Sequence, residues 1–469
     1  MKRRLVVFAA GMIELMGIPA RGQTAAPTAQ VVKGPDERFK ADVLVVVAHP
    51  DDEGGVTPYL ARAIYDEHKR VAVVYATRGG SGGNDYTREH GPALADIREQ
   101  EARAACAKLG INNVWFLEGK DTASQNVLNS LGNWGHGANL EALVRIVRLT
   151  RPDVIITWLP GIFIGENHGD HQAAGVLATE AFDTAAEPTA FPSQVAGATK
   201  RLEVHLENLT TWQPKKLYFF SDADDQQQFA GSGPAYSVKE ISPSQKKPYW
   251  RLALDSATPH LTQFPAEIHQ MTAMSDEQIN KFMDDPQHSW WTEPMTLIFG
   301  KASIDVERTA DVFSLLSLAP TPSAIGIAGS QGVAILHAEL DGPWRYYERF
   351  RSQHGLVGLP KAKVPEIEVK AGTNALIPLV ISHAATTTSE VSVTVTTPKG
   401  WTVVSGSGRL ILPTEQKTAV MVEVATPLLT KDQLKSVKPE DLIVSVSGEG
   451  TTSTEVRLRV LLKSNALPQ

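Results

Sequence analysis

Five short apolar runs between residues 40 and 220 constrain the fold of this chain more than any other feature. They alternate with segments in which apolar residues recur at helical spacing. The apolar runs are residues 43–48, 71–77, 114–117, 154–159 and 216–220, and the helical segments are residues 56–69, 94–109, 140–149 and 171–185. Strands that are apolar along their whole length are typical of a parallel sheet with helices on both faces. Because crossovers between parallel strands are right-handed, the pattern predicts a Rossmann-like, three-layer αβα domain of the α/β class with a mostly parallel sheet.

The C-terminal part has a different pattern. After a linker at residues 356–365, apolar and polar residues alternate along several short runs, such as residues 391–396 and 456–460. Period-two alternation with turn residues between the runs predicts an all-β, immunoglobulin-like sandwich over residues 366–465.

Residues 221–355 carry weaker signals. The clearest is Ser275, which precedes two acidic residues and a glutamine and therefore predicts the start of a helix. We expect this region to form peripheral elements on the core of residues 40–220, so that the α/β domain spans residues 36–355.

The first 22 residues have the three parts of a secretory signal. Residues 2–4 are basic, residues 5–16 are mostly apolar, and small residues at Ala20 and Gly22 fit a cleavage site. The apolar stretch is shorter than the roughly 20 residues that span a bilayer. We therefore expect a secreted or periplasmic protein that has no membrane span once the signal is removed.

Charge and cysteine content exclude some partners and bonds. The net charge is −7, so no overall positive field attracts nucleic acid or an anionic membrane. The chain has one cysteine, which excludes an intramolecular disulfide. This residue, Cys106, lies among alanines in a helical segment, which predicts a buried and unreactive thiol.

Two polar motifs follow strands of the predicted sheet. His49-Pro50-Asp51-Asp52-Glu53 comes directly after the first strand, and His168-Gly169-Asp170-His171 follows the fourth through a loop. Ligands bind at the carboxyl edge of an open parallel sheet, so the two motifs are expected to converge there. Imidazole and carboxylate groups suit Zn²⁺, and three protein ligands with an open position are typical of a catalytic site.

The motifs also contain groups for proton transfer. Asp51 stands beside an expected ligand and can accept a proton from a water that a metal has made acidic. His168 is the candidate for stabilising an oxyanion or protonating an amine, and Asp170 is a candidate for orienting a histidine. The structural alternatives are an acidic helix cap for the first motif and an exposed polar loop for the second.

The two motifs resemble those of the PIG-L/LmbE-type deacetylases. These are zinc-dependent enzymes that remove the acetyl group from N-acetylglucosamine-containing substrates, and the resemblance covers roughly residues 40–220. It implies that the metal ligands are His49, Asp52 and His171, the general base Asp51, the oxyanion-stabilising histidine His168, and the substrate-binding residues Arg98 and Asp121. Two departures are Gly169, where the family more often has proline, and Gly80, where it usually has glutamate.

The resemblance implies an N-deacetylase that converts an N-acetylated sugar or glycoconjugate into acetate and a free amine. Two alternatives stay open: a carbohydrate-binding envelope protein with a degenerate hydrolase domain, and a metallo-amidase for another N-acyl substrate. Another divalent metal in place of zinc is not excluded.

Other conspicuous residues are assigned weaker roles. The glycine-rich residues 79–83 lack the lysine of a phosphate loop and are expected to form a loop at the rim of the site. Trp290 and Trp291 are expected to pack in the protein, with stacking on a sugar ring as the alternative. His260 has no ligand-like partner nearby in the sequence and is expected to be structural or exposed.

Overall fold

The computed structural model describes residues 35–165, 168–197, 206–223, 225–264, 270–283, 294–320, 336–383, 388–413, 417–448 and 453–464. The predicted signal at residues 1–22 and the pair Trp290-Trp291 lie outside these ranges. Within them, no helix is long and apolar enough to cross a membrane.

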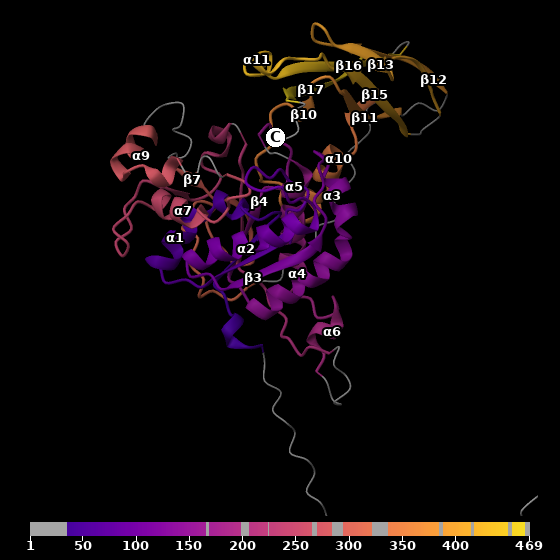
Figure 1. The fold of residues 1–469 in the computed structure, drawn as a ribbon. Coiled ribbons are helices and arrows are strands. Elements are labelled where there is room, and N and C mark those ends of the chain that lie inside the picture. The colour runs from indigo at the N-terminus through magenta and orange to yellow at the C-terminus, as the bar shows by residue number, and fades with distance from the viewer. Residues whose placement is uncertain are drawn as a thin grey trace, which may run out of the picture. The chain divides into compact units, whose positions relative to one another are not determined.

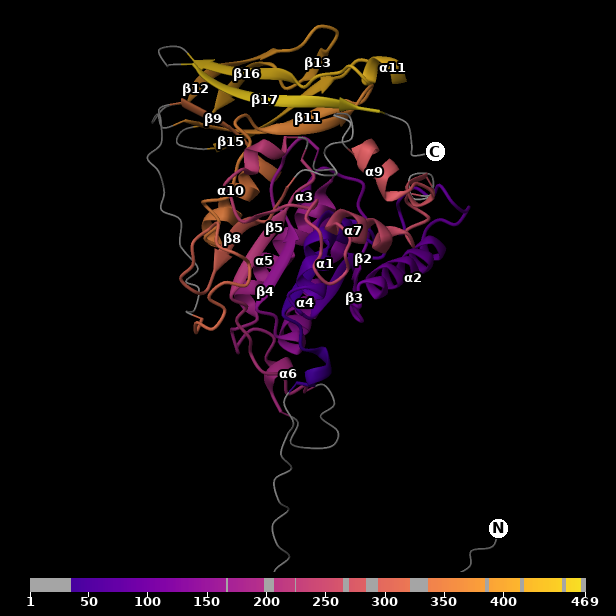
Figure 2. The same cartoon turned by 90° about the vertical axis from the view of Figure 1, so that its left-hand side faces the viewer.

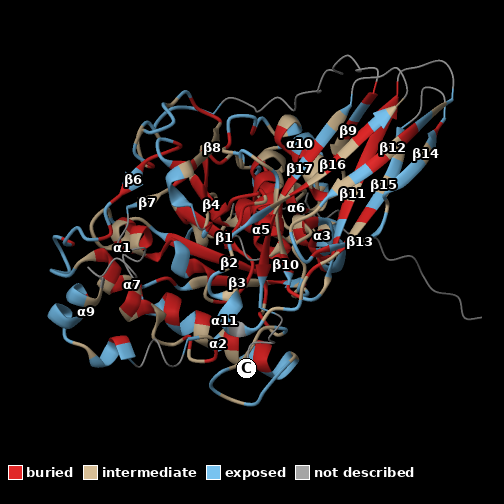
Figure 3. Cartoon of the chain, turned by 90° about the horizontal axis from the view of Figure 1, so that it is seen from above, coloured by how far each residue is buried: buried red, intermediate tan, exposed pale blue. Residues whose placement is uncertain are grey.

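A six-stranded sheet forms the centre of the α/β domain. Its strand order is β3-β2-β1-β4-β5-β8, in which the first five strands are parallel and β8 is antiparallel at one edge. The strands are β1 (Val43–Val47), β2 (Val71–Thr77), β3 (Asn113–Gly119), β4 (Val154–Trp158), β5 (Lys216–Phe220) and β8 (Ile298–Ala302). The predicted αβα fold is therefore confirmed. All residues of β1, β2, β4 and β5 are buried, which explains their unbroken apolar character (Figure 3).

Helices cover the sheet in two layers. Helix α7 contacts both α1 and α2, and α5 contacts both α3 and α4, so the helices fall into two groups (Figure 1). The helices are α1 (Thr57–Tyr65), α2 (Pro92–Lys108), α3 (Val127–Trp134), α4 (His136–Thr150), α5 (Gly169–Thr184), α6 (Pro192–Val195) and α7 (Tyr249–Ala257). Gly135, at φ +63°, separates α3 from α4, and only the second of these was expected from the sequence. Cys106 is 1% exposed in α2, as predicted.

The C-terminal region forms two sheets that share one apolar core. Their strand orders are β10-β17-β16-β12-β14 and β13-β15-β11-β9, and the two sheets lie face to face (Figure 2). The strands are β9 (Leu336–Leu340), β10 (Glu366–Lys370), β11 (Asn374–His383), β12 (Ser389–Thr396), β13 (Thr402–Ser405), β14 (Gly408–Leu412), β15 (Lys417–Ala425), β16 (Glu440–Gly448) and β17 (Thr454–Lys463). Every pairing is antiparallel except that of β10 with β17. A short helix, α11 (Lys431–Leu434), lies between β15 and β16.

Residues 221–355 supply elements to both parts of the chain. They contain η3 (Gln226–Phe229), β6 (Ala235–Tyr236), α7, α9 (Asp276–Met283), β7 (Met295–Thr296), β8, β9 and α10 (Pro343–Gln353). Two other short 3-10 helices, η1 (Glu37–Phe39) and η2 (Asp52–Gly55), lie in the N-terminal part of the α/β domain. The predicted helix start is present, because the Ser275 hydroxyl accepts the N–H of Gln278 at 3.2 Å. One strand departs from the expected division: β9 lies within the range assigned to the α/β domain but pairs with β11 of the sandwich.

Candidate active site at the carboxyl edge of the sheet

The first motif forms a tight turn after β1. Asp51 has φ +100°, a left-handed conformation that residues with a side chain rarely adopt, and η2 begins at the next residue. The Asp52 carboxylate turns back onto the strand end, where its Oδ2 atom accepts the N–H groups of Ala48 and His49 at 2.9 Å each. The same oxygen accepts the indole N–H of Trp158, also at 2.9 Å. The turn therefore presents a buried carboxylate whose position is fixed by three donors.

The second motif begins helix α5. His168 is the N-cap, in extended conformation, and its Nδ1 atom accepts the N–H of Asp170 at 3.3 Å. Gly169, where the family more often has proline, donates its N–H to the carbonyl oxygen of Ser124 at 2.5 Å. A Cβ atom at this position would lie 2.8 Å from backbone atoms of Asn126. The close approach of residues 124–126 thus explains the glycine in this chain.

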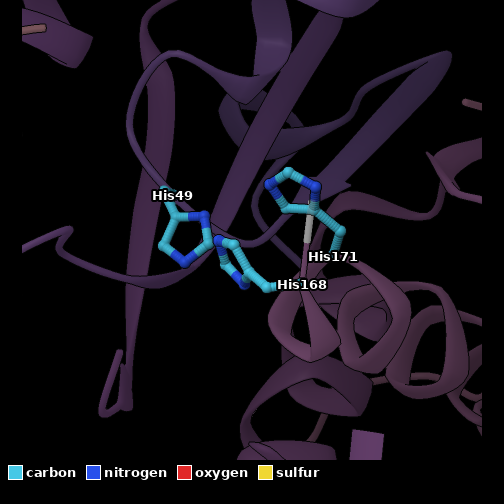
Figure 4. Close-up of side chains that lie close together, drawn as sticks. All are labelled: His49, His168 and His171. Atoms are coloured by element: carbon cyan, nitrogen blue, oxygen red, sulfur yellow. The ribbon is translucent and has the colours of Figure 1, made fainter. Parts of the chain in front are cut away.

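The two motifs meet although 119 residues separate His49 from His168. Ring nitrogens of His49, His168 and His171 lie within 4.8 Å of one another, and Figure 4 shows the three rings converging from β1 and α5. Asp52 touches two of them, since Oδ2 lies 3.5 Å from His49 Nδ1 and Oδ1 lies 3.3 Å from His171 Nε2. The structure therefore brings together the three predicted metal ligands, with His168 beside them.

Asp170 links the two motifs. Its Oδ2 atom lies 3.3 Å from Nε2 of His49 and accepts the N–H of Thr122 at 2.7 Å. A carboxylate on one ring nitrogen fixes the tautomer and leaves the other nitrogen, here Nδ1, available as a ligand. Asp121 also lies close to His49 and Asp170. One carboxylate oxygen from each aspartate and a ring nitrogen of His49 lie within 4.8 Å of one another.

The donor set and two partnerless atoms fit a divalent cation. Two imidazoles and one carboxylate are ligands that suit Zn²⁺ and related ions. Buried polar atoms normally have a hydrogen-bond partner, yet His171 Nδ1 and Asp170 Oδ1 are buried without one among the described residues. These features make His49, Asp52 and His171 a candidate metal site.

Burial and neighbouring charges shift the pKa values of the acid–base groups in different directions. Burial, together with the carboxylate of Asp52, raises the pKa of Asp51 to about 8. Burial and the nearby His49 and His171 lower the pKa of His168 to about 2, so its ring is neutral. Burial opposes ionisation of Asp52, but His171 and His49 outweigh it and hold the pKa of that carboxyl well below its usual range.

The predicted substrate-binding residues hold the glycine-rich loop. Arg98 is 6% exposed and donates to the carbonyl oxygens of Gly79 at 2.7 Å and Gly83 at 2.6 Å. Asp121 accepts the N–H of Ser81 at 2.9 Å. A Cβ atom at Gly79 would lie 3.2 Å from the Pro50 ring, so this loop packs against the first motif. Asp121 lies in the site, and the Arg98 guanidinium binds the two loop carbonyls and is near enough to Asp51 and Asp121 to feel their charge.

Sequence reasoning missed two residues that contact the site. The Trp158 ring stacks on His171 with centroids 4.1 Å apart. Trp158 is the last residue of β4, and this place at the carboxyl edge of the sheet could have indicated that it lies in the site. His260 is 2% exposed, and its Nε2 atom lies 2.7 Å from Oε1 of Glu53 in the first motif. It is therefore buried, and no local pattern indicates a partner 207 residues away.

Comparison with known proteins gives a family match for the part of the chain that holds both motifs. The sequence model of the PIG-L family, described as GlcNAc-PI de-N-acetylase, matches residues 44–182. The chain is 34% identical to 1D-myo-inositol 2-acetamido-2-deoxy-α-D-glucopyranoside deacetylase 1 of Frankia alni, over 36% of this chain and 59% of the relative. It is 29% identical to the 1D-myo-inositol 2-acetamido-2-deoxy-α-D-glucopyranoside deacetylase of Thermobifida fusca, over 47% of this chain and 82% of that relative.

Among solved structures, N,N′-diacetylchitobiose deacetylase from Pyrococcus horikoshii matches 55% of this chain and 84% of its own, with 19% identity and a TM-score of 0.38. The chain spans 59% and 57% of the length of the two Frankia relatives that it matches.

Proposed function

We propose that this chain, whose residues 44–182 form a PIG-L family domain, is a zinc-dependent hydrolase that removes the acetyl group from an N-acetylglucosamine-type sugar or glycoconjugate. The observation that carries the proposal is the convergence of His49, Asp52 and His171 beside Asp51 and His168. Metal ligands, a base and an oxyanion-stabilising group are the parts that metal-assisted amide hydrolysis uses. The names of the relatives support a sugar acetamide as the substrate class.

A Zn²⁺ ion held by His49, Asp52 and His171 would supply Lewis-acid chemistry, which polarises a carbonyl and makes water more acidic. Asp51 accepts a proton from the attacking water. It can then return the proton to the leaving nitrogen, which departs as the free amine.

His168 acts as a neutral hydrogen-bond donor. Since its Nδ1 atom accepts the backbone N–H of Asp170, the ring proton is on Nε2. That N–H can donate to the acetyl oxygen as it gains negative charge in the tetrahedral intermediate. Asp170 keeps His49 in one tautomer, and the Trp158 ring limits rotation of His171.

The test is release of acetate by the zinc-loaded protein from N-acetylglucosamine, N-acetylated oligosaccharides and N-acetylated peptides. We expect release from the sugars, and a rate reduced by about 100-fold or more in Asp51→Asn, which keeps the shape of the side chain but cannot accept the proton. Zinc content should be equal in the two proteins. Release from none of these compounds would overturn the proposal, and an unchanged rate in Asp51→Asn would overturn the role of Asp51.

We also infer export to the periplasm or the medium. This inference rests on residues 1–22. Mass measurement of the protein recovered from its host tests it: a mature N-terminus near residue 23 supports export, and an intact N-terminus in the cytosol contradicts it.

A further inference from the structure

Residues 260–263, which follow α7, contact the turn that carries Asp51. We refer to these residues as the 260–263 segment. His260 Nε2 lies 2.7 Å from Oε1 of Glu53, and Gln263 Nε2 donates to the carbonyl oxygen of Pro50 at 2.5 Å. No motif in the sequence assigns this segment a part in the reaction, yet it contacts the residues on both sides of the Asp51-Asp52 pair.

The two contacts act on one peptide group. Glu53 uses its second oxygen, Oε2, to accept the backbone N–H of Asp51 at 3.0 Å. His260 therefore holds the N–H end of the Pro50–Asp51 peptide through Glu53, and Gln263 holds the C=O end of the same peptide directly. Both polar ends of this peptide are fixed, and each depends on the 260–263 segment.

The orientation of this peptide determines where the Asp51 side chain points. Asp51 has φ +100° and ψ −25°, a backbone conformation that steric contacts disfavour in residues with a Cβ atom. Such conformations persist when the surrounding contacts over-determine them. Rotation of the peptide toward an ordinary negative φ would swing the carboxyl of Asp51 into another direction.

The contacts are well suited to resist that rotation. Glu53 is 4% exposed and His260 is 2% exposed, so water does not compete for their hydrogen bond. The segment is itself anchored on helix α2, because Thr262 donates from its N–H and its hydroxyl to the carboxylate of Glu101 at 3.0 and 2.6 Å. A rigid helix thus supports the segment, and the segment supports the turn.

We propose that the 260–263 segment positions the general base: His260, through Glu53, and Gln263, directly, hold the Pro50–Asp51 peptide in the orientation that presents Asp51 to the reacting atoms. The role in catalysis rests on the proposed function, while the hold on the peptide is a property of the turn alone. His260 and Gln263 are positioning residues, since neither contacts the three histidines.

Three variants test the proposal. His260→Phe keeps a ring but loses the N–H, His260→Gln keeps a donor, and Gln263→Met keeps the side-chain length without the amide. The matched control is His354→Phe. His354 Nδ1 lies 2.8 Å from a carboxylate oxygen of Asp183, so this change removes an imidazole–carboxylate contact of the same kind between the residue that follows α10 and helix α5.

The first measurement does not require activity. Hydrogen exchange of the Asp51 amide reports whether its N–H is held. We expect exchange about tenfold faster or more in His260→Phe and Gln263→Met, wild-type exchange in His354→Phe, and partial protection in His260→Gln. Unchanged exchange in His260→Phe and Gln263→Met would overturn the proposal whatever the protein's activity.

The second measurement is acetate release from N-acetylglucosamine. We expect kcat to fall about 10- to 100-fold in His260→Phe and in Gln263→Met, with KM and zinc content within about twofold of wild type. His260→Gln should recover most of the loss. The double variant should lose less than the product of the two single losses, because both changes release one peptide.

The outcomes separate the two proposals. A purely structural role would lower the folded fraction in all variants, including His354→Phe, and leave kcat per folded molecule unchanged, which would overturn positioning. If the wild-type protein releases no acetate from any N-acetylated compound, the proposed function fails, and the exchange of the Asp51 amide still decides whether the segment holds the turn.

Discussion

Oδ2 of Asp170 lies 3.3 Å from Nε2 of His49, and the other nitrogen of that ring faces Asp52 at 3.5 Å. The imidazole is thus held between carboxylates from the two sequence motifs. Asp170 sits in the first turn of α5 and is fully buried, so its position is set by the helix and not by solvent. We therefore expect the metal affinity of the proposed site to depend on Asp170, which is not one of its three proposed ligands.

Asp170→Asn should weaken zinc binding. The amide is a weaker acceptor than the carboxylate and no longer favours the tautomer that leaves Nδ1 of His49 available. We expect the zinc dissociation constant to rise by about 10- to 100-fold in calorimetric titration. Asp183→Asn, which alters a buried carboxylate bonded to Lys301 and His354, is the control and should bind zinc as wild type does. Equal affinity in Asp170→Asn and wild type would remove Asp170 from this role.

His171→Ala should abolish stable zinc binding. The change removes one of three proposed ligands and leaves the stacked face of Trp158 uncovered. Elemental analysis after dialysis should find less than about a tenth of the wild-type zinc content. His136→Ala, a histidine at the start of α4, provides the comparison. Full zinc occupancy in His171→Ala would refute its assignment as a ligand.

Gly169→Ala should destabilise the domain, although the family more often has a larger residue at this position. The added Cβ would lie 2.8 Å from the backbone of Asn126, which cannot move aside without shifting the chain that leads into α3. We expect the free energy of unfolding in urea to fall by about 1–3 kcal/mol. Gly137→Ala is the matched change in open space within α4, and it should leave stability unchanged or raise it by up to about 1 kcal/mol. Equal stabilities for the two variants would contradict the proposed close approach.

The His136–Glu180 pair predicts a pH-dependent contribution to stability. The hydrogen bond that the His136 ring donates to the Glu180 carboxylate outweighs burial and raises the pKa of His136 above its ordinary value. A group whose pKa is raised on folding stabilises the protein fully below its unfolded pKa of about 6.5, and this contribution disappears as the pH rises through the folded pKa.

The variant His136→Gln tests whether this contribution to the free energy of unfolding decreases as the pH rises. Because the His136 side chain is 32% exposed, we expect it to lose only about 0.5–1 kcal/mol of unfolding free energy at pH 5, and less than half of that at pH 9. His90→Gln, at an exposed position, should show no such trend. A loss that grows with pH would contradict the assignment.

The sequence predicts the α/β core because each buried strand is apolar throughout, and because the first motif directly follows one strand and the second follows another through a loop. The same rule predicts that His49 and His171 meet, since the carboxyl ends of neighbouring parallel strands share one edge. The contacts of Arg98 could not be predicted in this way, because it donates to the carbonyl oxygens of Gly79 and Gly83 and no residue type indicates a backbone carbonyl partner. Its role in substrate binding stays a prediction.

Two further features depend on long-range contacts. The pairing of β9 with β11 joins strands on either side of α10 and the predicted linker, so turn signals alone cannot indicate it. His260 lies in a segment without periodicity, and its partner is set by how α7 packs on α1 and α2. Such contacts arise from tertiary packing, which local patterns do not encode.

The separation of His260 from the first motif has a consequence for the order in which the protein matures. A ribosome makes the chain from its N-terminus, so all three proposed ligands exist before residue 260 has been added. Until then the Glu53 carboxylate, buried in the finished fold, lacks its imidazole partner. The ligand set is therefore complete in the growing chain before the residues that hold the Asp51 turn have been added, so that the metal site and the position of the general base are completed by different parts of the sequence.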